Sequence, residues 1–145
     1  MRLTSPAFND QGVIPVKFTC EGEDINPAFI IEDIPRSAKS LALIVDDPDA
    51  TTGTWVHWVV YNIPPLPRID EDSIPGEQGI NSAGGKDYHG PCPPSGSHRY
   101  FFKAYALDAQ LDLKPGLNKQ ELEKAIAGHI IQKAELMGLY RKSGR

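Results

Sequence analysis

Three long apolar segments, rich in β-branched and aromatic residues, constrain the fold of this chain more than any other feature. They span residues 40–45, 55–63 and 98–107, and residues that form turns bound them. Segments of this length and composition predict β-strands, and the first two are apolar enough to be buried on both faces. Thirteen prolines and thirteen glycines among the 145 residues supply the turns of a β-rich fold. The length favours a single domain over residues 1–145.

The side chains of a strand alternate between its two faces, which predicts where the polar residues of these segments point. In the second segment, His57 is expected on the same face as Trp55, Val59 and Tyr61. In the third segment, His98 and Tyr100 are expected on one shared face, as the wall of a pocket requires.

Most of the remaining chain divides into a long loop and one helix. Residues 65–90 are polar, rich in glycine and proline and without periodicity, which indicates a surface loop. Asn118, followed by Glu121, fits a helix N-cap with an acid that reaches back to it. Apolar residues then recur at helical spacing, at Leu122, Ile126, Ile130 and Met137. We therefore expect one amphipathic helix over residues 119–137, ending near Gly138.

The chain has two cysteines, Cys20 and Cys92, which are too few for a disulfide framework or a four-ligand zinc site. Two free buried thiols are the interpretation that we favour. A single bridge that closes a long loop is the alternative, and it would suit a heat-adapted organism. A catalytic thiol is not expected, because no helix N-terminus that could activate Cys92 is evident.

The charge of the chain argues against some classes of binding partner. With a net charge of −4 and a pI of about 5.5, the chain lacks the basic character of proteins that bind nucleic acid or anionic membranes. No basic amphipathic helix is present, so stable membrane insertion is not expected. The first residues lack the apolar core of a signal peptide, and no stretch approaches about 18 consecutive apolar residues. These features predict a cytoplasmic protein.

Polar residues interrupt or end the apolar segments and form the candidate site. Asp47 and Asp49 follow the first segment, His57 lies within the second, and His98 and Tyr100 begin the third. A structural interpretation is open for them: Asp side chains stabilise turns, and a single histidine within a strand is commonly a core residue.

Anion binding explains more of these residues than the other chemistries. Histidines and carboxylates can hold a metal, but no short histidine spacing is present, so we expect no metal and no cofactor. Ser95 and Ser97 lie near His98, yet no nucleophile-elbow pattern surrounds them. Histidine and tyrosine side chains, and the backbone of small turn residues, can donate hydrogen bonds to phosphate oxygens. A nearby carboxylate would hold a histidine in its donor form.

Several segments that occur together, in order, carry a resemblance. They are Asp-Pro-Asp-Ala at 47–50, Trp-Val-His-Trp at 55–58 and Gly-Pro-Cys-Pro-Pro-Ser-Gly-Ser-His-Arg-Tyr at 90–100, with Thr-Cys-Glu-Gly-Glu-Asp-Ile at 19–25 and Ala-Gly-His at 127–129. Through them essentially the whole chain resembles the phosphatidylethanolamine-binding protein family. The closer match is its short bacterial and archaeal branch, often labelled Raf kinase inhibitor-like.

The resemblance implies a mainly β fold with two antiparallel sheets, Greek-key connections and a C-terminal α-helix. It also implies a small pocket for phosphate or phosphorylated head groups. The residues carried over by motif are Asp47, Asp49, His57, Cys92, Pro93, His98 and Tyr100. Of these, Asp49 is expected to stabilise the turn beside the pocket. One departure is Thr51, where the family commonly has proline, and it implies a different pocket rim.

The resulting hypothesis is a non-enzymatic protein that binds a small phosphate-bearing ligand and modulates a protein partner, a kinase or a protease. Relatives of the bacterial type also suggest a homodimer. Two alternatives remain open: a protease inhibitor that acts through a surface loop, and a hydrolase or metal-dependent enzyme that uses the same acids and histidines.

Overall fold

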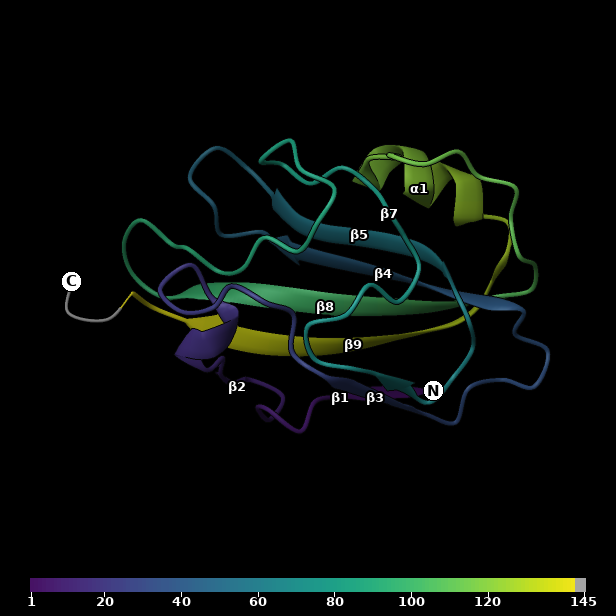
Figure 1. The fold of residues 1–145 in the computed structure, drawn as a ribbon, viewed down its shortest axis with the longest axis horizontal. Helices are drawn as coiled ribbons and strands as arrows, with labels where there is room; N and C mark the ends of the chain where they lie inside the picture. Colours follow the sequence, from purple (N-terminus) through teal and green to yellow (C-terminus); the bar gives the residue numbers. More distant parts are fainter. Residues whose placement is uncertain (143–145) are drawn as a thin grey trace.

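The computed structural model describes residues 1–142, which form two β-sheets, one α-helix and one short 3-10 helix (Figure 1). The larger sheet has the strand order β2 (Gly12–Val13), β9 (Ile130–Tyr140), β8 (His98–Leu107), β4 (Ser40–Asp47), β5 (Trp55–Ile63) and β7 (Glu77–Gln78). The smaller sheet has the order β1 (Arg2–Thr4), β3 (Phe29–Glu32) and β6 (Arg68–Ile69). The helices are η1 (Val16–Phe18) and α1 (Lys119–Ile126). The described pairs are antiparallel except β2 with β9.

The three strands predicted from the apolar segments are confirmed. β5 and β8 have the predicted bounds, and β4 runs two residues beyond its predicted end, to Asp47. β4 pairs with β5 on one side and with β8 on the other, and all eight of its residues are buried. The predicted fold class, mainly β with two sheets and a helix, is also confirmed.

Each face of the large sheet has its own apolar core. The small sheet covers one face, where Phe29 and Ile31 pack against residues such as Trp58 and Phe102. Helix α1 covers part of the other face, where Leu122 and its neighbours meet β4 and β5. Figure 1 shows the two coverings apart, with α1 at the top of the view and β1 and β3 at the bottom. The central strands are apolar on both faces because both are covered.

The helix predicted over residues 119–137 is confirmed only in its first part. Its start is correct, since the Asn118 side chain accepts from the Glu121 backbone N–H at 2.8 Å and Glu121 accepts from the Asn118 backbone N–H at 3.0 Å. The helix ends at Ile126, before Gly128, and the chain then continues as strand β9.

Pairing with β8 explains why residues 130–140 form a strand. β9 lies antiparallel to β8 along nearly its whole length, from His98 opposite Tyr140 to Leu107 opposite Ile130. Leu136, Gly138 and Tyr140 are buried alternately, with the period of two that a strand requires. Tertiary pairing therefore overrides the helical spacing of Ile130 and Met137 read from the sequence.

Residues 65–90 form mostly irregular structure, as expected, but the two short strands β6 and β7 lie within them. In the chain up to residue 142, no helix combines the length and the apolar composition that crossing a bilayer demands.

Candidate functional site

Three strand ends meet at one end of the large sheet. Because β4 is antiparallel to both β5 and β8, its last residues lie beside the first residues of those two strands, with Asp47 opposite Trp55. A cavity of about 360 Å³ lies there. It is lined by Asp47, Ala50, Thr51, Thr52, Trp55, His57, His89, Cys92, Pro93, Pro94, His98 and Tyr100.

A β-bulge in β5 places His57 in this cavity. Val45 pairs with Trp58 but the next residue of β4, Asp46, pairs with Val56, so His57 is the extra residue of the bulge. A bulge redirects the side chain of the inserted residue. The His57 ring consequently meets Tyr100, edge to face, with ring centroids 5.3 Å apart.

The prediction that His57 shares a face with Val59 and Tyr61 is therefore wrong. Those two residues pack in the core beneath α1, whereas Tyr100, the ring that His57 meets, belongs to the core on the opposite face. Simple alternation fails here because the bulge adds one residue to the strand.

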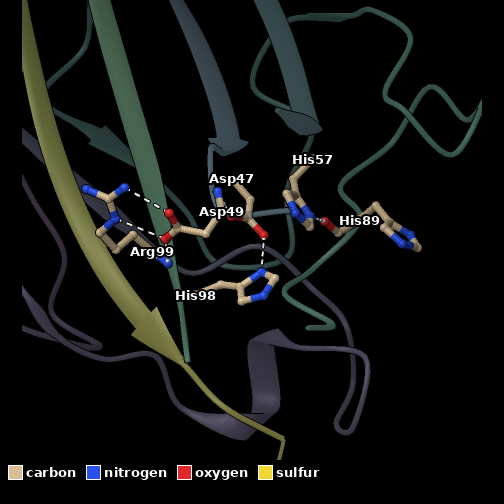
Figure 2. Close-up of polar contacts among 6 residues, drawn as sticks. All are labelled: Asp47, Asp49, His57, His89, His98 and Arg99. Carbon is tan, nitrogen blue, oxygen red and sulfur yellow. Dashed lines mark hydrogen bonds and ion pairs between the residues drawn. The ribbon is translucent and has the colours of Figure 1, made fainter. Parts of the chain in front are cut away.

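Asp47 and His98 form a buried pair. His98 Nδ1 donates to Asp47 Oδ2 at 2.7 Å, while Asp47 Oδ1 accepts from the Asp49 backbone N–H, also at 2.7 Å. Figure 2 shows the Asp47 carboxylate between the His98 and His57 rings. The carboxylate thus stabilises the turn and orients a histidine at the same time, so both interpretations of Asp47 hold.

His57 is held by a backbone group. Its Nδ1 bonds to the carbonyl oxygen of His89, so Nδ1 carries the proton and donates (Figure 2). In the neutral ring, Nε2 is then a hydrogen-bond acceptor. Burial lowers the pKa of His57, although the His89 carbonyl and the charge of Asp47 oppose the shift. The ring is therefore neutral near pH 7.

Tyr100 supplies a hydroxyl without a partner. Its Oη is buried and has no hydrogen-bond partner among residues 1–142, although the nearby backbone of Cys92 acts to lower the pKa of the phenol. Burial first, and then the charge of Asp47, raise the pKa of Tyr100. The phenol therefore keeps its proton and remains a donor.

Asp49 lies beside the cavity but does not line it. Its carboxylate accepts from Arg99 Nη2 at 2.8 Å and from Arg99 Nε and backbone N at 2.9 Å (Figure 2). The Arg99 side chain, above all, lowers the pKa of Asp49 to about 2. Asp49 thus binds Arg99 next to the site, and it is not among the residues that line the cavity.

Cys20 and Cys92 form a disulfide, so the favoured prediction of two free thiols is wrong and the alternative of one bridge is correct. The two residues are 72 positions apart in sequence, and their Cα atoms are 5.4 Å apart. Sequence spacing alone could not reveal this proximity, because the tertiary fold creates it. The bridge ties Cys92, in the cavity wall next to Pro93, to the segment after η1.

Hydrogen bonds hold the same wall. They run from Tyr88 Oη to Phe18 O at 2.7 Å, from Gly90 N to Asp24 Oδ1 at 2.7 Å and from Cys20 N to Pro91 O at 3.1 Å. A Cβ atom at Gly90 would lie 2.4 Å from both Phe18 O and Asp24 Oδ1, so only glycine permits this approach. The loop from 88 to 93 is thus fixed against the N-terminal part of the chain.

His89 is the functional candidate that sequence reasoning missed. It is not among the predicted site residues, yet it lines the cavity and its carbonyl oxygen bonds to His57. The centroids of the His89 and His57 rings are 6.0 Å apart. Its position directly before Gly90, at the start of a segment already singled out, was the available signal. Thr51, expected to alter the rim, also lines the cavity.

The cavity therefore offers polar groups that the protein does not use itself. They are the Tyr100 hydroxyl and the Nε2 atoms of His57 and His98, whose Nδ1 atoms are occupied. Ser95 and Ser97 do not line the cavity, and neither does any other serine among residues 1–142. The hydroxyl donates, and each Nε2 accepts when its ring is neutral and donates when its ring is protonated, so together these groups suit an anion or a polar head group.

Comparisons with known proteins agree with this architecture. The model of the family described as phosphatidylethanolamine-binding protein matches residues 4–141. A UPF0098 protein of Methanothermobacter thermautotrophicus is 49% identical over 150 residues, covering 98% of this chain and 99% of the relative. A UPF0098 protein of Chlamydia trachomatis is 47% identical over 149 residues, with 98% and 99% covered.

Two solved structures share the fold along almost its whole length. A phosphatidylethanolamine-binding protein homologue of Chlamydia trachomatis superposes with a TM-score of 0.95 at 47% identity, covering 98% of this chain and 97% of the other. YbcL of E. coli, described as a new member of the mammalian family, gives a TM-score of 0.89 at 27% identity, with 98% of each chain covered. The resemblance found in the sequence is confirmed: this chain belongs to the phosphatidylethanolamine-binding protein family.

Proposed function

We propose that this protein is a non-enzymatic binding protein whose cavity holds a phosphate group or a phosphorylated head group. The observation that carries the proposal is the Tyr100 hydroxyl, which is buried, lines the cavity and lacks a hydrogen-bond partner among residues 1–142. Leaving such a group unpaired costs about 1–3 kcal/mol. A ligand oxygen that accepts from this hydroxyl removes that cost, so the cavity favours a ligand rich in acceptors.

The two histidines extend the match to phosphate. A protonated Nε2 donates to a phosphate oxygen, and a neutral Nε2 accepts from the P–OH of a singly ionised phosphate. Because the second pKa of a phosphate ester is about 6, both forms of the ligand are present near neutral pH. Asp47 keeps His98 oriented for either role at 2.7 Å. The description of the solved Chlamydia trachomatis relative refers to phosphatidylethanolamine, which makes phosphoethanolamine an appropriate probe.

The partner in this proposal is a protein, a kinase or a protease, whose phosphorylated residue enters the cavity. The family resemblance supports this part, and so does the size of the cavity, about 360 Å³, which fits a phosphorylated side chain better than an intact lipid.

Calorimetric titration with inorganic phosphate and with phosphoethanolamine, at pH 6 and pH 8, tests the proposal. We expect saturable binding that is tighter at pH 6, because a protonated histidine donates to the anion. Tyr100→Phe should weaken binding about tenfold without lowering the melting temperature, since the lost hydroxyl bonds only to the ligand. His98→Ala should abolish binding.

His129→Ala is the matched control, because His129 pairs with Asp108 at 2.8 Å at the surface rather than at the cavity. It should bind phosphate as the natural protein does. No saturable binding in the natural protein, or equal affinity in Tyr100→Phe, would overturn the proposal. Release of inorganic phosphate from phosphoethanolamine during the titration would overturn its non-enzymatic part.

A further inference from the structure

A second, smaller cavity lies next to the first and is lined by cationic side chains. It has a volume of about 170 Å³ and is lined by Pro94, Ser95, Gly96, Arg141 and Lys142. Pro94 also lines the larger cavity, so the two cavities are neighbours on the loop that leads into β8.

The strand register explains how Arg141 and Lys142 come to this position. His98, the first residue of β8, pairs with Tyr140, the last residue of β9. Continuing this antiparallel pairing brings the next residues of the chain opposite the loop that precedes His98. Figure 1 shows the end of β9 beside that loop. The same pairing that buries His98 in the cavity thus places two cations at its rim.

Neither cation is used within the described part of the chain. Up to residue 142, six lysine and arginine side chains form ion pairs, such as Arg99 with Asp49. The side chains of Arg141 and Lys142 form neither an ion pair nor a hydrogen bond with any residue in that range. The carboxylate of Glu21 accepts from the hydroxyl of Tyr140, the residue before Arg141. The rim therefore presents two adjacent positive charges in a protein whose net charge is −4.

The loop that precedes β8 is open to a ligand. Ser95, Gly96 and Ser97 are exposed, and a Cβ atom at Gly96 would meet nothing within 4 Å. An extended peptide advances about 3.3 Å per residue, so a chain with its phosphorylated residue in the larger cavity reaches the rim within a few residues. Hydroxyl and backbone groups of this loop can bond to such a chain.

We propose that Arg141 and Lys142 form a subsite for acidic residues that neighbour the phosphorylated residue of a bound peptide. This inference rests on the proposed function, because the phosphate must occupy the larger cavity. A phosphopeptide is favoured over an anionic membrane surface, since two cations on a net acidic chain fall short of the four to eight that lipid recognition uses.

The test compares two acetylated, amidated peptides, phosphoserine-Asp-Asp and phosphoserine-Asn-Asn, with inorganic phosphate as the third ligand. The natural protein should bind the acidic peptide about fivefold more tightly than the neutral one, as two exposed ion pairs permit. Raising the salt from 50 to 500 mM should reduce this preference. The double variant Arg141→Gln/Lys142→Gln should bind the two peptides within twofold of each other, with the affinity for inorganic phosphate changed less than twofold.

Lys124→Gln/Lys133→Gln is the matched control, because it removes the same charge from exposed positions on α1 and β9 that line neither of these two cavities. It should keep the fivefold preference. If the natural protein binds phosphate but not the acidic peptide preferentially, the subsite is refuted and the proposed function stands. If phosphate itself does not bind, the proposed function fails. Binding to phosphatidic acid vesicles that is lost in the Arg141/Lys142 variant, with no peptide preference, would assign the rim to lipid and overturn the peptide proposal.

Discussion

Two pairs of histidine and aspartate in this chain have nearly the same contact and very different surroundings. His98 Nδ1 lies 2.7 Å from Asp47 Oδ2, and His129 Nδ1 lies 2.8 Å from Asp108 Oδ1. The side chains of the first pair are 10% and 4% exposed, whereas those of the second are 41% and 53% exposed. The first pair lines a cavity with a free tyrosine hydroxyl, and the second lies where α1 leads into β9.

The comparison teaches that a contact by itself does not define a site. An exposed pair competes with water at high dielectric and contributes little, whereas a buried pair fixes the orientation of its ring and must be satisfied. What distinguishes the pair of His98 and Asp47 is the cavity around it, which the bulge at His57, the Tyr100 hydroxyl and the disulfide of Cys92 help to form.

The largest expected effect on stability comes from removing the disulfide between Cys20 and Cys92. The double variant Cys20→Ser/Cys92→Ser should lower the free energy of unfolding by about 4 kcal/mol, because the bridge closes a long loop and its loss frees the unfolded chain. Urea denaturation measures the change, with the reduced natural protein as a second form lacking the bridge. Histidine ring NMR signals should shift for His98, next to the loosened loop, and stay in place for His129. An unchanged urea midpoint would contradict the importance of the bridge.

Replacing one acid of each pair tests the comparison directly. Asp47→Asn should lower the free energy of unfolding by about 1–3 kcal/mol, because a buried charged acceptor for two donors is lost. Asp108→Asn should change it by less than about 0.5 kcal/mol, because that pair is exposed. Equal losses in the two variants, measured by denaturant titration, would mean that burial does not separate the pairs.

A smaller effect on stability is expected at the ion pair of Asp49 and Arg99, which lies beside the cavity. The folded-state pKa of Asp49, about 2, is below its ordinary value of 3.8, so this ion pair stabilises the protein above pH 4. That contribution should be lost as the pH falls from about 4 to about 2. Asp49→Asn should be less stable at pH 7 than the natural protein and should lose less stability on acidification. Parallel acid profiles for the two proteins, followed by circular dichroism, would refute this assignment.

The smallest effect concerns His57. Its folded-state pKa lies below the ordinary value of 6.5, so the unfolded chain takes up a proton more readily than the folded one. Stability contributed by the neutral ring should be complete above pH 6.5 and should decline as the pH falls below it. His57→Gln, whose amide can still donate to the His89 carbonyl, should flatten this decline in thermal melts, whereas His129→Gln should leave it as it is. The reverse ranking would show that His57 is not the group that titrates.

Much of this protein could be read from the sequence because the decisive signals are local. The apolar runs predict β4, β5 and β8, since strand periodicity and residue type are properties of a few neighbouring residues. The shared face of His98 and Tyr100 follows from the same alternation, and both residues line the cavity. The N-cap of α1 at Asn118 is likewise a local pattern of side chain and backbone.

Other features depended on pairing between distant segments, and only the tertiary structure decided them. The register between β4 and β5 created the bulge that turned His57 toward Tyr100. Pairing with β8 made residues 130–140 a strand where local spacing favoured a helix. The 72-residue separation of Cys20 and Cys92 concealed a bridge, and the position of His89 in the wall came from the same long-range packing. Local sequence sets which conformations a segment prefers, but backbone hydrogen bonds to a distant partner decide which of them the folded chain adopts.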